Sequence, residues 1–255
     1  MPFLDALSPL SGTLELVLIA LSALTSAISA SAGIGGGTLL IIVMAQVMPA
    51  VALIPVHGMV QFGSNLGRAA LTWRHIDRRL IAAFLPGVVL GALVAAWLLI
   101  RLPGGVLELC IALFVLYSCW GPSLPKRRLG QGTTLLAGAV TTLLSSLIGA
   151  SGPLVAAFVK HSQTTPFARV ATFAACMSLQ HLTKAFVFGF AGFVFRDWLG
   201  LMIAMIAAGL LGTWLGLRLL KGLSAERFDS LFKWMLTLLA LRLLWMGVEQ
   251  IITPQ

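Results

Sequence analysis

Charged residues are scarce in this chain. Asp, Glu, Lys and Arg together make up 10% of its 255 residues, whereas hydrophobic residues make up 59%. A typical soluble domain is about 25% charged. Only eight residues are acidic, and none falls in the middle of a predicted helix. A buried cation site or a carboxylate proton relay therefore lacks its ligands, as does the acid–base pair of a membrane-embedded hydrolase.

Cysteine is also rare. The three cysteines, Cys110, Cys119 and Cys176, all lie in apolar segments, and no two of them form a CxxC pair. We expect them to be small core residues rather than members of a disulfide or zinc framework. No nucleophile or metal cluster stands out, so the chain is not expected to be an enzyme or to hold a metal or cofactor.

Long runs without charge dominate the remaining sequence. Residues 16–67 contain no charged residue, and the mean hydropathy of the chain is +1.00. A bilayer-spanning helix needs about 20 apolar residues. The runs are continuous rather than alternating, which excludes a membrane barrel. The sequence therefore predicts an all-α polytopic membrane protein. The first segment is interpreted as a retained helix, because no Lys or Arg precedes Arg68 and Asp5 lies where a signal peptide would be basic.

Glycine, proline and charge divide the chain into ten predicted helices. Their approximate ranges are 12–32, 36–48, 51–72, 80–100, 104–120, 132–149, 153–161, 168–191, 198–220 and 228–251. The second and seventh are too short to span about 30 Å at about 1.5 Å per residue. Such half-helices are tolerated only where they are buried in protein or line a cavity.

The two halves of the chain resemble each other at a constant offset of 116 residues. This offset aligns Gly33 with Gly149, Gly36 with Gly152, Asn65 with His181 and Arg68 with Lys184. We therefore expect a single transmembrane domain over residues 1–255, built from repeats at about 10–120 and 132–251. Each repeat contains a glycine-broken half-helix hairpin followed by three transmembrane helices.

Loop charge predicts that the two repeats are inverted. Basic residues gather in loops such as 73–79 and 126–128, and the loop at 192–197 is balanced. Since basic loops face the cytoplasm, this pattern places both termini outside. Inverted repeats with interrupted helices are typical of secondary transporters.

The helix breaks are candidate anion sites. A helix N-terminus has unpaired N–H groups and a partial positive charge, and glycine lets a ligand approach the backbone. The candidates from the two breaks are Gly35, Gly36, Gly37, Thr38, Ser151 and Gly152. The alternative is close helix packing, which we expect for the pairs Gly87/Gly91 and Gly212/Gly216.

Polar residues on the third and eighth helices complete the predicted site. Gln61, Asn65, Gln180 and His181 would orient the anion. Arg68 and Lys184 would attract it from opposite mouths or screen its charge, unless they only snorkel to the membrane surface. His57 is compatible with either packing or function. Since polar groups are expensive in hydrocarbon, these helix faces should line the interior.

These residues carry a family resemblance. Gly33-Ile-Gly-Gly-Gly-Thr-Leu-Leu-Ile41, Gly149-Ala-Ser-Gly-Pro153, the loop Arg74-His-Ile-Asp77 and the Gly87/Gly91 pattern resemble the TauE/SafE sulfite exporter family. The resemblance covers essentially the whole chain. It implies a transporter of sulfite or of organosulfonates such as sulfoacetate in the bacterial inner membrane.

The predicted function is therefore secondary transport of a small anion by alternating access. The expected partners are this anion, membrane lipid and protons as the coupling ion, with His181 as the proton carrier; nucleic acid is not expected. A passive anion channel, a membrane assembly factor and an enzyme remain as alternatives.

Overall fold

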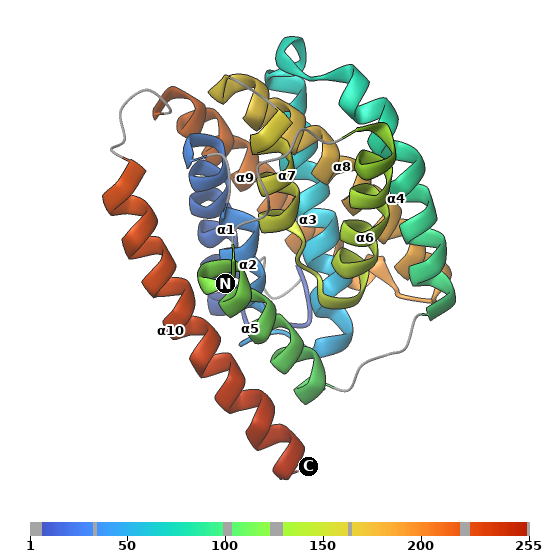
Figure 1. Ribbon diagram of the computed structural model, residues 1–255. Coiled ribbons are helices and arrows are strands. Elements are labelled where there is room, and N and C mark those ends of the chain that lie inside the picture. The colour runs from blue at the N-terminus through green and yellow to red at the C-terminus, as the bar shows by residue number, and fades with distance from the viewer. Residues whose placement is uncertain are drawn as a thin grey trace.

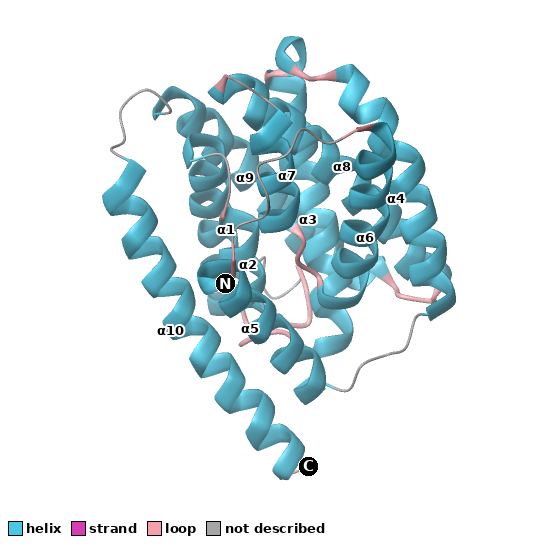
Figure 2. Cartoon of the chain, in the orientation of Figure 1, coloured by secondary structure: helices cyan, strands magenta, loops and turns pink. Residues whose placement is uncertain are grey.

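The computed structural model describes residues 7–32, 35–98, 104–122, 130–162, 165–219 and 225–253. These residues form helices and no strands (Figures 1 and 2). The α-helices are α1 (Gly12–Ala32), α2 (Gly36–Met44), α3 (Ala50–Leu71), α4 (Arg78–Leu98), α5 (Gly104–Trp120), α6 (Gln131–Ile148), α7 (Gly152–Ser162), α8 (Pro166–Phe190), α9 (Leu199–Leu219) and α10 (Ala225–Ile252). Short 3₁₀ turns, η2 (Trp73–His75) and η3 (Phe195–Trp198), precede α4 and α9.

The all-helical prediction is confirmed, and most helix bounds agree to within three residues. The exception is α2, which was expected to continue to residue 48 and instead ends at Met44. Beyond it, the N–H groups of Gln46 and Val47 bond to the carbonyls of Val43 and Met44, so the chain tightens into three-residue turns. Pro49 follows, and a residue before proline is disfavoured in the α conformation.

The chain is a multi-pass membrane protein. Within the described part of the chain, five helical segments are long and apolar enough to cross a bilayer: Gly12–Ser31, Arg78–Leu98, Gln131–Ile148, Phe195–Arg218 and Lys233–Ile252. Large apolar side chains such as Leu93, Trp97 and Trp245 are exposed on the outside, whereas the interior holds many hydroxyl and amide groups. An apolar outer surface over an interior that also holds polar groups fits a protein surrounded by lipid.

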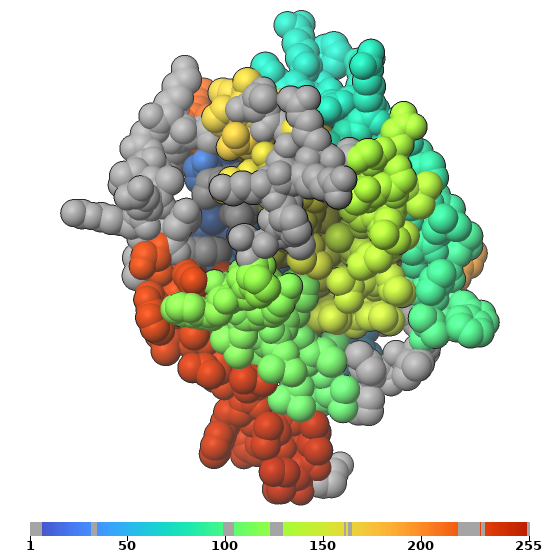
Figure 3. Space-filling model, viewed as in Figure 1, coloured from blue at the N-terminus to red at the C-terminus, as the bar shows by residue number. Residues whose placement is uncertain are grey.

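The helices pack in four main pairs. These are α1 with α9, α4 with α6, α3 with α8, and α5 with α10. Figure 3 shows α5 in green beside α10 in red on one face of the molecule. If the first five helices correspond in order to the last five, α1 corresponds to α6 and α4 to α9. The α1–α9 pair is then equivalent to the α6–α4 pair, and the other two pairs each join a helix to its own counterpart. The four main pairs are therefore consistent with a correspondence between the first five helices and the last five.

Small residues allow two of these pairs to pack closely. A β-carbon at Gly87 or Gly91 of α4 would collide with a backbone carbonyl of α6. Likewise, a β-carbon at Gly212 or Gly216 of α9 would collide with a backbone carbonyl of α1. All four glycines thus occupy the packing positions expected of them.

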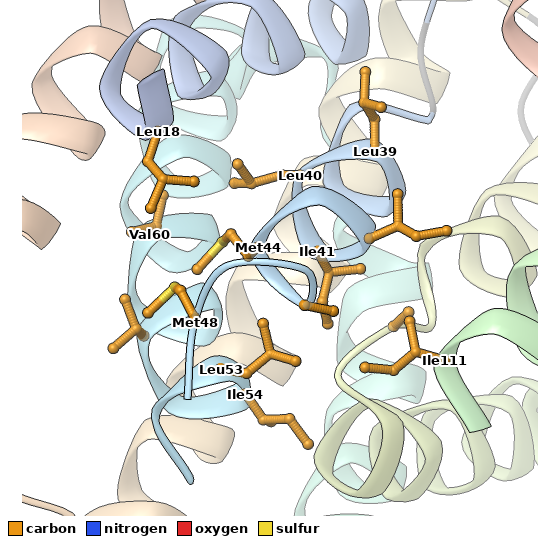
Figure 4. Packing of buried hydrophobic residues seen from close by; sticks show 14 of the residues in the cluster. Leu18, Leu39, Leu40, Ile41, Met44, Met48, Leu53, Ile54, Val60 and Ile111 are labelled. Atoms are coloured by element: carbon orange, nitrogen blue, oxygen red, sulfur yellow. The ribbon is translucent and has the colours of Figure 1, made fainter. Parts of the chain in front are cut away.

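The half-helix α2 is almost completely buried. Its apolar side chains lie among those of α1, α3 and α5 (Figure 4). The residues labelled there are Leu18, Leu39, Leu40, Ile41, Met44, Met48, Leu53, Ile54, Val60 and Ile111. A helix of nine residues is marginal by itself. This apolar packing holds α2 in place and fixes the position of its N-terminus.

Candidate functional site

Both helix breaks open onto one internal cavity of about 20 Å³. About 10–15 Å³ is enough to hold a water molecule, so the cavity has room for one or two. It is lined by the start of α2, the α6–α7 turn and side chains of α1, α3 and α8. The lining residues are Ser29, Gly35, Gly37, Thr38, His57, Gln61, Asn65, Gly149, Ala150, Ser151, Gly152, Phe173, Met177 and His181.

Glycine is required at two of these positions by the backbone. Gly35, immediately before α2, has φ of 104°, and Gly149, immediately after α6, has φ of 81°. Residues with a β-carbon rarely adopt a positive φ. These conformations let the chain turn sharply and begin a new helix at the cavity wall. Gly33, the repeat equivalent of Gly149, lies outside the described residues.

Helix α3 lines the cavity with three polar side chains, His57, Gln61 and Asn65, spaced four residues apart. A spacing of four places them on one face of the helix. Their positions in the second repeat, at the offset of 116, are Phe173, Met177 and His181 of α8, and these three also line the cavity. The two repeats therefore contribute the same positions but not the same chemistry.

A hydrogen-bonded chain on α3 leads from Arg68 to the cavity. Arg68 Nη1 donates to Asn65 Oδ1 at 3.1 Å, and Asn65 Nδ2 donates to Gln61 Oε1 at 3.1 Å. Because Gln61 Oε1 is thus an acceptor, its Nε2 group is left as a donor. Gln61 Nε2 makes no hydrogen bond among the described residues, although the side chain is buried.

Lys184 supplies a second buried cation. It runs past Gly58 of α3, where a β-carbon would lie 2.9 Å from Lys184 Cδ, and its Nζ donates to the carbonyl of Gly149 at 3.2 Å. The side chain is 0% exposed. Its ammonium group therefore lies directly against the turn that lines the cavity.

Gln180 holds the same turn from its other side. Ser151 Oγ donates to Gln180 Oε1 at 2.9 Å, and Gln180 Nε2 donates to Thr141 Oγ1 at 2.6 Å. Ser151 lines the cavity, whereas Gln180 is behind it. Gln180 is therefore connected to the cavity lining through Ser151.

The two repeats meet at a pair of histidines. The rings of His57 and His181 are 5.9 Å apart between centroids and nearly perpendicular. His57 Nε2 donates to the carbonyl of Gly37 at 3.1 Å. The Nδ1 atoms of both rings are buried and have no partner among the described residues.

The charged groups described at the site are all positive. Arg68 and Lys184 are both buried, and none of the described residues that line the cavity carries a carboxylate. The N-termini of α2 and α7 add their partial positive charges. Across the described residues, no group of three His, Cys, Asp or Glu side chains could hold a metal ion. A small anion is the ligand that this charge pattern would stabilise.

Comparison with known families agrees with the resemblance noted in the sequence. The family model described as "Sulfite exporter TauE/SafE" matches residues 18–243, which include both breaks and all the residues that line the cavity. The chain belongs to the TauE/SafE sulfite exporter family. Searches of curated proteins and of solved structures return no match. TauE/SafE proteins are transporters, so the cavity lies in a transporter of this family.

The structure brings most of the predicted TauE/SafE site residues together. Those that line the cavity are Gly35, Gly37, Thr38, Gln61, Asn65, Ser151, Gly152 and His181. Gly36 instead faces α1, where a β-carbon would collide with the carbonyl of Thr25. Its lack of a side chain therefore serves packing, unlike that of Gly152, where the nearest atom to a β-carbon is 3.9 Å away.

The two cations lie deeper than expected from their positions along the helices. Arg68 and Lys184 were expected near opposite mouths or as snorkelling residues, but they are only 1% and 0% exposed. Each is hydrogen-bonded to a residue that lines the cavity. Neither reaches the protein surface, and both heads lie beside residues that line the central cavity.

Several cavity residues were not among the predicted site residues. They are Ser29, His57, Gly149, Ala150, Phe173 and Met177. Phe173 and Met177 have no polar group to attract notice. The offset of 116 residues was the available signal, because it aligns them with His57 and Gln61.

Proposed function

We propose that this TauE/SafE protein is a secondary transporter that carries a small anion by alternating access. Sulfite or an organosulfonate such as sulfoacetate is the proposed substrate. The observation that carries the proposal is the shared cavity, where two helix N-termini, two buried cations and unpaired polar side chains converge.

Specific groups are proposed to bind the anion. The first three N–H groups of α2, those of Gly36 to Thr38, have no carbonyl partner within the helix. At the start of α7, Pro153 has no N–H and Leu154 N–H bonds to the carbonyl of Ser151, so the N–H of Gly152 is the donor left there. These groups would donate to the anion together with Gln61 Nε2. Ser29 and Thr38 carry buried hydroxyl groups at the same cavity. Arg68 and Lys184 would supply positive charge without touching the ligand.

Alternating access would arise from inverted repeats. The α1–α9 pair is equivalent to the α6–α4 pair when the two halves of the chain are matched, and this supports a pseudo-two-fold relation between the halves. In transporters of this architecture, substrate sites lie near the bilayer midplane where the repeats meet. We place the protein in the bacterial inner membrane as one domain, with both termini in the periplasm.

Site-directed labelling tests this topology. Single cysteines placed in the 73–79 loop and in the 192–197 loop should react with a membrane-impermeant maleimide from opposite sides of the membrane. The reason is that the first loop is basic and the second is balanced. Labelling of both loops from the same side would contradict the inverted arrangement.

Protons are the proposed coupling ion. The cavity contains no carboxylate among its described lining residues, so His57 and His181 are the side chains lining it that could accept a proton. An anion beside them would compensate the added positive charge. Proton binding and anion binding should therefore favour each other, as linkage requires.

Transport by a carrier rather than a channel can be measured in proteoliposomes. Vesicles loaded with unlabelled sulfite should accumulate labelled sulfite against its gradient by counterflow, because a carrier exchanges one bound anion for another. An imposed pH gradient should drive net sulfite movement in the same vesicles. Labelled sulfite that only equilibrates would favour a passive channel, and counterflow without an effect of pH would exclude proton coupling.

A further inference from the structure

The cavity has a polar and an apolar wall, and this difference bears on the shape of the substrate. Three equivalent positions of the two repeats face the cavity, and at two of them a polar residue of α3 corresponds to an apolar residue of α8. His57 and Gln61 of α3 correspond to Phe173 and Met177 of α8. A symmetric inorganic anion would gain nothing from an apolar wall.

The apolar wall is part of a larger apolar cluster. Phe173 and Met177 pack with Phe84 of α4 and with Val155 and Val159 of α7. The two side chains are 7% and 5% exposed. A hydrogen-bonding group placed against them would lose water without gaining a partner, which costs free energy.

The polar wall, in contrast, can receive the charged group. Gln61 Nε2 lacks a partner among the described residues, and the amide lies 3.3 Å from where a β-carbon of Gly37 would be. The amide is therefore next to the N-terminus of α2. A sulfonate head here would meet a helix N-terminus, an amide donor and the Arg68–Asn65 chain behind it.

We propose that Phe173 and Met177 are specificity-determining residues that select an anion with a short apolar arm. The charged head lies against α3 and the start of α2, and the arm lies against α8. The inference rests on the proposed function of anion transport. It narrows the organosulfonates proposed above to those with an apolar end. Sulfoacetate is disfavoured among them, because its second charged group would face the apolar wall.

The side chain of Met177 can also make room for the arm. The cavity of about 20 Å³ holds one or two water molecules, so a larger ligand requires a side chain to move. Methionine is unbranched and has three rotatable bonds, which lets it adapt to different shapes. Rotation of Met177 would enlarge the cavity on the apolar side.

The test compares two sulfonates of similar size and equal charge. Propanesulfonate ends in a methyl group and 2-hydroxyethanesulfonate ends in a hydroxyl group. We expect purified protein to bind propanesulfonate more tightly by about fourfold or more, the value of one buried methylene group. Met177→Gln, which copies the residue of the first repeat, should abolish or reverse this preference, and Met177→Leu should retain it.

Each outcome of the titrations is informative. Equal binding of the two sulfonates by the unmodified protein, or a preference that persists in Met177→Gln, would overturn the role of the apolar wall. Binding of sulfite without binding of either sulfonate would overturn it too, while leaving the proposed anion transport intact. Binding of none of the three anions would overturn the proposed function and the inference together.

Discussion

Replacement of Lys184 by methionine should weaken anion binding by roughly 5- to 1000-fold. A charge several Å from an anion contributes about 1–4 kcal/mol, depending on the effective dielectric. Lys184 Nζ is bonded to the carbonyl of Gly149 beside the cavity, and the side chain is completely buried. Little water is therefore present to screen this charge. Titration of sulfite or a sulfonate into detergent-purified protein measures the loss.

The effect should not depend on the side from which the anion arrives. A charge at one mouth would affect binding from that side only, whereas Lys184 lies at the central turn. Transport in vesicles of known orientation should show the same change in apparent affinity for external and internal substrate. A change on one side only would place Lys184 at a gate instead.

A matched control distinguishes the loss of a charge at the cavity from the loss of one positive charge anywhere in the protein. Lys160 lies in the same repeat, on α7, and is exposed. Lys160→Met changes the net charge equally, yet the charge it removes is screened by solvent. It should leave anion affinity unchanged. Lys184→Met should also remain folded, because an apolar side chain of similar length replaces a costly buried charge.

The helices could be predicted from the sequence because the residues near each helix end determine where the helix begins or stops. Charge-free runs separated by basic loops or glycine predicted ten helices, and the described residues form ten. The end of α2 was placed four residues too late. Residues 45–48 are apolar and compatible with a helix, but the approaching Pro49 favours tighter turns.

Only part of the site could be predicted from the sequence. The glycine breaks and the polar face of α3 identified Gly37, Gln61 and Asn65, because glycine and polar residues are costly within membrane helices. Phe173 and Met177 could not be recognised as cavity residues from local pattern. An apolar side chain in a membrane helix looks the same whether it faces lipid, core or cavity.

Helix periodicity also could not show how deep Arg68 and Lys184 lie. Position along a helix gives the distance of the α-carbon from the helix centre, whereas a lysine or arginine head can lie several Å from it in either direction. In this structure Lys184 points to Gly149 and Arg68 to Asn65, so both heads point to the cavity lining. The location of the two heads therefore follows from their hydrogen-bond partners rather than from the positions of the residues along the helix.

The two break glycines Gly36 and Gly152 should respond oppositely to leucine, although the repeat aligns them. At Gly36, a β-carbon would collide with the backbone carbonyl of Thr25, which cannot move without displacing α1. Gly36→Leu should therefore fail to accumulate as folded protein. At Gly152, the nearest atom to a β-carbon is Phe173 Cζ at 3.9 Å, which is an ordinary contact. Gly152→Leu should fold, as judged by a symmetric size-exclusion peak and thermal unfolding near that of the unmodified protein.

Folded Gly152→Leu should nevertheless lose anion binding. The longer side chain would cover the N–H group of Gly152, which lies at the cavity. It is the donor left at the start of α7, because Pro153 has no N–H and Leu154 N–H bonds to the carbonyl of Ser151. Hydrogen bonds to a charged group contribute about 1.5–3 kcal/mol each, so each lost bond should weaken binding roughly 10- to 150-fold. Gly132→Leu is the control, because this exposed glycine at the start of α6 has open space around it and lies away from the cavity. It should change neither folding nor binding. Anion binding by Gly152→Leu at the affinity of the unmodified protein would mean that the start of α7 does not contact the anion.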